Sequence, residues 1–146
     1  IFILSLMVID ETDNFDYFFY KFNISKKDQK RIKNIDNFFK EKIKSKKFSE
    51  NNLNRIFYYE GKQAVNDILN FQIVKSKKNE ENFTELIDHY KDKKIPKMPI
   101  GADFLMTKFN IEEGKLLGAK LKIIENEWVK NNFKISDDQI NYIINN

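Results

Sequence analysis

The sequence predicts an all-α protein, and three observations lead to that prediction. Apolar residues recur at spacings of three and four along most of the chain, as they do on one face of an α-helix. Residues that commonly cap helices precede several of these stretches. No stretch alternates apolar and polar residues as a half-buried β-strand does. We therefore expect an irregular helical array that forms two small helical subdomains.

Each helix expected in the first region, residues 1–94, carries an apolar stripe. The stripes comprise Phe15, Phe18, Phe19 and Phe22; Ile32, Ile35, Phe39 and Ile43; Leu53, Ile56 and Phe57; Ala64, Val65, Ile68, Leu69 and Ile73; and Phe83, Leu86, Ile87 and Tyr90. The expected N-terminal caps are Thr12, Ser25, Ser49 and Asn79. Ser25 with Asp28 resembles a capping box, and Gly61 is expected to end the third helix.

A boundary between two regions is predicted at the segment KDKKIPKMPIG. Its two prolines stop a helix and favour extended backbone. The second region, residues 95–146, is expected to hold helices from about Ala102 to Phe109 and from about Glu113 to Asn131. Asn110 is expected to end the first of these in a left-handed conformation, and Ser136 to cap a last helix.

Composition indicates a globular protein and excludes several other classes. Hydrophobic residues make up 41% of the chain, which argues against disorder although 33% of the residues are charged. The absence of cysteine excludes disulfides and thiolate metal sites and fits a cytoplasmic protein. The net charge of +4 permits binding to nucleic acid without establishing it.

The opening segment, IFILSLMVID, is apolar but too short for a membrane helix, which needs about 20 such residues. It also lacks the basic leader and the small-residue cleavage site of a signal peptide. We interpret it as part of a buried helix that is truncated on its N-terminal side, and we expect no membrane association.

The segment from residue 98 to 133 holds three of the four glycines and the only tryptophan. Gly114 and Gly118 lie four residues apart on the expected long helix, where each costs up to about 1 kcal/mol relative to alanine. Close packing of helices would offset that cost, and so would the close approach of a phosphate backbone to bare peptide groups. Trp128 is expected to pack in the core. At the start of the preceding helix, Asp103 complements the helix dipole and Gly101 permits a sharp entry.

This segment resembles the C-terminal end of bacterial class II tRNA nucleotidyltransferases, the CCA-adding enzymes and bacterial poly(A) polymerases. The matching residues are Gly101, Asp103, Phe104, Leu105, Gly114, Gly118, Leu121 and Trp128. Two upstream stretches, YKFNISKKDQKRI and LNRIFYYEGKQAVNDIL, resemble further segments of that family in the same order. The resemblance extends from about Tyr20 to Ile140, with Lys115 where the family usually has proline.

The resemblance implies that residues 1–94 correspond to the family's body, truncated on its N-terminal side, and residues 95–146 to its tail. The catalytic head, with its Gly-Ser turn and Asp-x-Asp pair, has no counterpart here, so we expect no catalytic residue in this chain. Mg²⁺ and the nucleoside triphosphate would bind that missing head. The Asp-x-x-Arg spacing of the family's neck occurs at Asp28 and Arg31, in the wrong segment, and we interpret it as a coincidence. The choice between CCA and poly(A) addition would lie in the missing parts.

The function that the resemblance implies is tRNA binding, mainly through the RNA backbone. Such binding depends on lysines and exposed helix termini more than on sequence-specific pockets. The expected RNA-binding residues are Lys108, Gly114, Lys115, Gly118 and Lys122, and the expected structural motif is Gly101, Asp103, Leu121 and Trp128. His89 is not expected to bind a metal, because a metal site needs several converging ligands.

Three alternatives remain open. The chain could be half of a split enzyme that works with a separately encoded head-and-neck polypeptide, with IFILSLMVI as the interface. It could be a non-functional gene remnant. It could also be a helical protein-interaction module unrelated to RNA.

Overall fold

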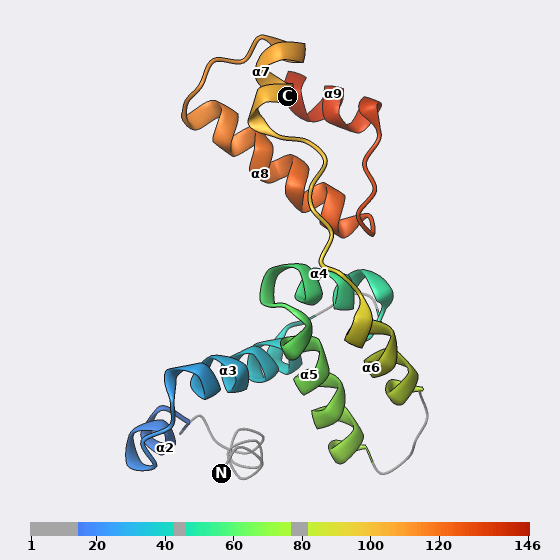
Figure 1. The fold of residues 1–146 in the computed structure, drawn as a ribbon. Helices are drawn as coiled ribbons and strands as arrows, with labels where there is room; N and C mark the ends of the chain where they lie inside the picture. The colour runs from blue at the N-terminus through green and yellow to red at the C-terminus, as the bar shows by residue number, and fades with distance from the viewer. Residues whose placement is uncertain (1–14, 43–45, 77–81) are drawn as a thin grey trace. The chain divides into compact units, whose positions relative to one another are not determined.

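The computed structural model describes residues 15–42, 46–76 and 82–146, and the all-α class is confirmed for them. This part of the chain forms eight helices and no strand (Figure 1). The helices are α2 (Phe15–Lys21), α3 (Lys26–Lys40), α4 (Glu50–Glu60), α5 (Lys62–Lys75), α6 (Phe83–Asp92), α7 (Ala102–Phe109), α8 (Lys115–Lys130) and α9 (Asp137–Asn145).

The chain divides into two compact units. The first contains the described residues as far as Lys46 and those of Tyr59–Lys93, and the second contains Lys47–Tyr58 and Lys94–Asn146. The division after Lys93 falls inside the predicted boundary segment. Residues 47–58 belong to the second unit, whereas they were predicted to belong to the first region. They pack with the second unit because their side chains contact α8 and the turn that follows it.

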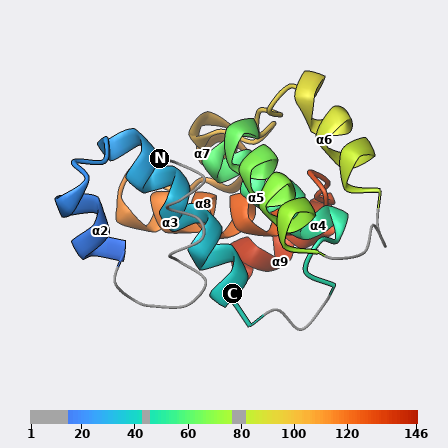
Figure 2. The ribbon, with the colours of Figure 1, turned by 90° about the horizontal axis from the view of Figure 1, so that it is seen from below.

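In the first unit α5 lies between α3 and α6 (Figure 1, Figure 2). The buried apolar side chains of these three helices are Ile32, Ile35 and Phe38; Ala64, Val65, Ile68 and Leu69; and Phe83 and Tyr90. A smaller cluster joins α2 to the start of α3 through buried Phe19, Ile24 and Ile32. Within the predicted phenylalanine stripe, Phe19 is buried, whereas Phe22 is 50% exposed because it lies beyond the end of α2.

In the first unit, helix ends are set by nearby residues: a capping side chain at α3 and a glycine between α4 and α5. The Ser25 Oγ caps α3 by accepting from the Asp28 N–H at 3.2 Å. The Asp28 carboxylate accepts from the Ser25 hydroxyl at 2.8 Å. Gly61 alone separates α4 from α5, with φ of +84°, a conformation that glycine adopts at little cost. The predicted caps Thr12 and Asn79 lie outside the described residues, as does Ile43 of the predicted stripe.

In the second unit α8 packs against both α7 and α9. The core between them contains buried Leu105, Leu117, Ile124 and Ile140. The bounds of α7 agree with the prediction, and Asn110 ends it in the left-handed conformation at φ of +52°. Helix α9 begins with a capping box, in which Ser136 and Gln139 satisfy each other's backbone N–H groups. This cap bears out the expected role of Ser136.

The other end of α8 is held by a mixed polar and aromatic cluster. Trp128 is 3% exposed, which confirms its expected place in the core. Its ring lies 5.4 Å from that of Tyr58 and 5.0 Å from that of Phe133, measured between ring centroids. Asn54 is 1% exposed and donates to the Asn132 side-chain oxygen at 3.0 Å. These contacts join α4 to the end of α8.

Candidate nucleic-acid interface

The N-terminus of α8 carries most of the residues predicted to bind RNA. Gly114 is the N-cap, with φ of +155° and no side-chain hydrogen bond to cap the helix. The first N–H groups of any helix lack an acceptor within the helix, and glycine has no side chain to supply one. The same end of the helix carries a partial positive charge. This terminus therefore presents backbone donors to an anion, with the exposed carboxylates of Glu112 and Glu113 directly before it.

Lys115, Gly118 and Lys122 lie on one face of α8, at spacings of three and four residues, and all three are exposed. Among the described residues, neither lysine side chain has a hydrogen-bond or ion-pair partner. A Cβ atom built on Gly118 would meet no atom within 4 Å. Close helix packing, one of the two explanations considered for Gly118, is therefore wrong in this structure. Gly114 also has nothing within 4 Å, and its positive φ accounts for that glycine instead.

Lys108, the remaining predicted RNA-binding residue, differs from the α8 lysines. Its Nζ atom lies 3.6 Å from the Asp137 carboxylate. The same atom is 5.1 Å from the centroid of the Phe104 ring. The lysine thus has an acidic partner on α9, in an exposed ion pair that a phosphate can displace at small cost.

The predicted structural motif divides into core and surface residues. Trp128 is buried, and Leu121 is half-buried against the second unit's core. Asp103 is exposed in the first turn of α7, where its charge complements the helix dipole. Gly101, which was expected to permit a sharp entry into α7, has no special backbone conformation. Gly101 has φ of −107° and ψ of 177°, a conformation open to every residue.

Arg31 has a structural role. Its guanidinium donates two hydrogen bonds to the Asp67 carboxylate, each of 2.8 Å, and one of 3.2 Å to Asp28. The hydrogen bond to Asp67 raises the pKa of Arg31, against a smaller lowering caused by burial. Arg31 therefore links α3 to α5 through Asp67, while Asp28 contacts the same guanidinium from within α3.

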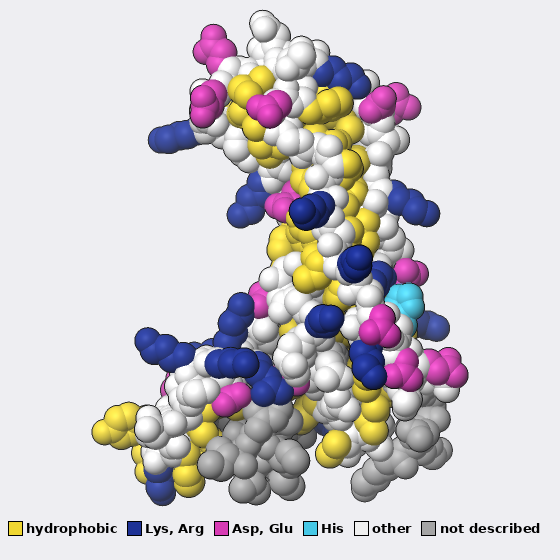
Figure 3. All heavy atoms as spheres, in the orientation of Figure 1, with side chains coloured by type: hydrophobic (Ala, Val, Ile, Leu, Met, Phe, Trp, Pro, Cys, Tyr) yellow, Lys and Arg dark blue, Asp and Glu magenta, His cyan; other side chains and the backbone are white. Residues whose placement is uncertain are grey.

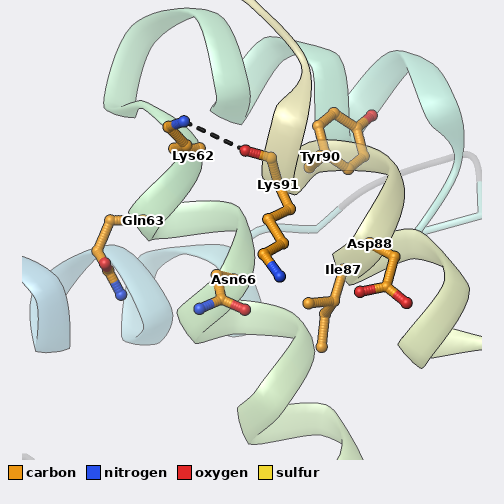
Figure 4. Close-up of a pocket in the computed structure, with 7 residues that line it drawn as sticks. All are labelled: Lys62, Gln63, Asn66, Ile87, Asp88, Tyr90 and Lys91. Atoms are coloured by element: carbon orange, nitrogen blue, oxygen red, sulfur yellow. Dashed lines mark hydrogen bonds between the residues drawn. The ribbon is translucent and has the colours of Figure 1, made fainter.

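A hollow of about 390 Å³, which was not predicted from the sequence, lies between α5 and α6 in the first unit (Figure 4). At one end, the Lys62 ammonium donates to the Lys91 carbonyl oxygen at 3.2 Å. The Lys91 side chain extends toward Asn66 and Ile87 (Figure 4). The other lining residues are Gln63, Asp88 and Tyr90. In the described part of the chain, no three His, Asp or Glu side chains converge as metal ligands would.

Comparison with known proteins adds no assignment. No protein-family model, curated protein or solved structure matches this chain. The resemblance to tRNA nucleotidyltransferases thus stays a prediction based on the residues that suggested it. Among the helices that the structure describes, none combines the length and the apolar character needed to cross a membrane.

One group of surface residues was not predicted from the sequence. Tyr17, Tyr20 and Phe22 are 64%, 87% and 50% exposed, although the aromatics of this stretch were expected to lie mainly in the core. A signal was present, because Tyr17 and Tyr20 fall between the members of the phenylalanine stripe. They therefore point to the opposite side of a helix.

Proposed function

We propose that this chain binds the backbone of structured RNA, with tRNA as the class that the family resemblance implies. The observation that carries the proposal is the exposed face of α8, where Lys115 and Lys122 flank the unpacked Gly118. A glycine inside a helix costs about 1 kcal/mol relative to alanine, and no neighbouring side chain in this structure offsets that cost. The approach of a ligand to the bare backbone would explain why glycine, despite this cost, occupies position 118.

The geometry of this face suits a phosphate backbone. Lys115 precedes Gly118 by three residues and Lys122 follows it by four, so a phosphate at Gly118 would have an ammonium group on each side. The two lysines are separated by about 10 Å along the helix axis. The uncapped N-terminus, one turn away, would add backbone donors to the same contact. Nothing in this arrangement reads base identity, which fits recognition of RNA through its backbone.

In this proposal the chain binds RNA, and another polypeptide carries the catalytic site. If the resemblance holds, the nucleotidyl-transfer site, with its Mg²⁺ and nucleoside triphosphate, belongs to a head and neck encoded elsewhere. The proposed partners are therefore tRNA and such a polypeptide, and the proposed location is the cytoplasm. The body would comprise the first region and the tail the second.

A salt titration of tRNA binding tests the proposal. Lys115→Glu/Lys122→Glu should weaken binding to tRNA, and the slope of log K against log salt should become shallower by roughly 1.4 to 1.8, since each of the two lost phosphate contacts removes about 0.7 to 0.9. Lys108 is left unchanged, because glutamate there would face Asp137 and disturb the contact between α7 and α9. A DNA hairpin serves as the competitor.

The matched control carries the same charge change in the second unit but outside α8. Lys97 and Lys134 are both exposed, and Lys97→Glu/Lys134→Glu should reduce tRNA affinity far less. Equal losses in the two double variants would mean that only net charge matters. Unchanged affinity in Lys115→Glu/Lys122→Glu would refute the α8 site.

A protein-interaction module is the second candidate. Leu116 and Ile123 are 62% and 46% exposed and lie seven residues apart, on one side of α8. This candidate predicts that the chain binds tRNA no better than the DNA hairpin. In that case Leu116→Asp should abolish binding to a protein partner, while Lys115→Glu/Lys122→Glu should leave that binding intact.

A further inference from the structure

The net positive charge of the chain comes from one segment. Residues 15–42 contain eight lysine and arginine residues against four aspartate and glutamate residues, a surplus of four. That surplus equals the net charge of the whole chain, so the remaining residues carry equal numbers of basic and acidic side chains. The segment that holds α2 and α3 is therefore a basic region that can attract a polyanion.

The lysines of α3 project from one face of the helix. Lys26, Lys30, Lys33 and Lys40 follow helical spacing and are exposed. Basic side chains gather over α3 in the space-filling view (Figure 3). Lys30 and Lys33 contact Glu60 and Asp16, with side chains that are 69% and 47% exposed. Exposed ion pairs of this kind are weak and screened by salt, so a phosphate can displace the carboxylate at small cost.

Aromatic rings are exposed beside these charges. Tyr17, Tyr20 and Phe22 are 64%, 87% and 50% exposed, so their rings are open to solvent. The Lys21 ammonium lies 5.8 Å from the centroid of the Tyr17 ring and 6.0 Å from that of Phe22. The inward side of α2 is already occupied, because Phe19 is buried against α3. The outward rings are therefore not needed for this packing.

We propose that this surface, made of the outward side of α2 with Phe22 and the lysine face of α3, binds single-stranded RNA. Unpaired bases stack on Tyr17, Tyr20 and Phe22, while Lys21 and Lys26 contact the adjoining phosphates. Lysines interleaved with open aromatic rings are the combination that proteins use for unpaired strands, because every base offers a face for stacking. This inference rests on the proposed RNA-binding function and adds to it a second surface, in the other unit, with a different RNA structure as its ligand.

The kind of exposed side chain favours nucleic acid over a lipid surface. In residues 15–42 the large hydrophobic side chains that are more than one-third exposed are all aromatic. The isoleucines, Ile24, Ile32 and Ile35, are buried. A helix that inserts into a membrane usually exposes aliphatic side chains along with its aromatic ones. Rings without exposed aliphatic neighbours suit stacking on bases.

The test measures the binding of a labelled oligouridylate of about 12 nucleotides to the full chain by fluorescence anisotropy. Tyr17→Ala/Tyr20→Ala should weaken this binding roughly tenfold or more, since each ring stacks on a base. Tyr17→Phe/Tyr20→Phe keeps both rings and should bind as the native chain does. Tyr142→Ala removes a tyrosine of α9 that is 71% exposed and should have no effect. Circular dichroism checks that all the variants fold.

The two proposed surfaces can fail separately. Lys115→Glu/Lys122→Glu should weaken tRNA binding and leave oligouridylate binding intact. Tyr17→Ala/Tyr20→Ala should weaken oligouridylate binding and leave tRNA binding intact. If Tyr17→Ala/Tyr20→Ala binds oligouridylate as the native chain does, the α2 surface is refuted while the α8 surface stands. A native chain that binds neither RNA refutes both. If the native chain binds oligothymidylate as tightly as oligouridylate, RNA is not the specific ligand. If Tyr17→Ala/Tyr20→Ala keeps its affinity for oligouridylate but loses binding to phosphatidylserine vesicles, the α2 surface binds a membrane and not nucleic acid.

Discussion

Arg31 and Asp67, which are 36 residues apart, form a two-point ion pair that joins α3 to α5. Both hydrogen bonds measure 2.8 Å, and the Asp67 side chain is 6% exposed. Gln63 donates a further hydrogen bond of 2.9 Å to the same carboxylate. Apolar contacts tolerate some sliding of one helix on another, whereas a bidentate pair fixes one geometry. The lysine face of α3 is thus held in a set orientation on the first unit.

Asp67→Asn should lower the free energy of unfolding by about 2 to 3 kcal/mol. The variant keeps the shape of the side chain but leaves the Arg31 charge without its main partner. Urea denaturation followed by circular dichroism measures the loss. Lys30→Ala, which removes an exposed ion pair with Glu60, is the control and should cost less than about 1 kcal/mol. Equal losses in the two variants would contradict a special role for Asp67.

The Arg31 contribution should not vary with pH near neutrality. Asp67 raises the pKa of Arg31 above its ordinary, already strongly alkaline value. A group whose pKa is raised on folding contributes its full stability below the unfolded pKa and loses it as the pH rises through the folded one. The difference in unfolding free energy between the native chain and Arg31→Gln should therefore stay constant between about pH 6 and pH 9. A slope in that window would assign the effect to another group.

Trp128→Ala should destabilise the second unit by about 3 to 5 kcal/mol, because it leaves a cavity between the Tyr58 and Phe133 rings. Trp128→Phe keeps a ring in the site and should cost less. Circular dichroism is the right probe, since the chain has no other tryptophan to report by fluorescence. If Trp128→Ala costs under about 1 kcal/mol, the aromatic cluster does not hold α4 to α8.

Gly118→Ala should raise stability and lower RNA affinity together. The new methyl group meets nothing within 4 Å, so the helix should gain up to about 1 kcal/mol. The same methyl group would keep a phosphate away from the backbone. Thermal unfolding measures the stability of the variant, and tRNA titration of the same sample measures its affinity. A more stable variant with unchanged tRNA affinity would show that the glycine serves no ligand. Gly114→Ala should instead destabilise, because φ there is +155°.

Ser136→Ala should cost about 1 kcal/mol, because it removes the hydroxyl that accepts from the Gln139 N–H. Ser136→Asp retains an acceptor at the same position and should restore most of the stability. Helix α9 carries the buried Ile140, so loss of the cap should be seen in the unfolding of the second unit. No change in the urea midpoint of Ser136→Ala would mean that packing alone holds α9.

Periodicity and capping chemistry predicted much of the fold because both act over a few residues. The spacing of Leu53 and Phe57 identified the buried side of α4, and both are fully buried. Asn110 ends α7 as predicted, and Ser136 caps α9. The polar contacts in the cores were not predictable in this way. Asn54 bonds to Asn132, which lies 78 residues further along the chain, and no local pattern encodes such a pair.

The candidate site was partly predictable for the same reason. Lys115, Gly118 and Lys122 were predicted to bind RNA because the lysines cluster near the glycines, and the structure exposes all three. Whether a glycine is covered depends on where other helices lie, and here α7 and α9 pack on the opposite side of α8. Local spacing carries no information on that arrangement. It could, however, have revealed Tyr17 and Tyr20, which fall outside the phenylalanine stripe.

The assignment of residues 47–58 to the second unit has a consequence for synthesis on the ribosome. Asn54 and Tyr58 leave the exit tunnel long before their partners Asn132, Glu125 and Trp128 exist, because translation proceeds from the N-terminus. The first unit can complete its packing while this inserted helix still waits for its partners. The Tyr58 ring therefore lacks its two aromatic neighbours during that interval, and slow translation of the last third of the gene would lengthen it. A fragment cut at the proline segment would leave Asn54 and Tyr58 without these partners.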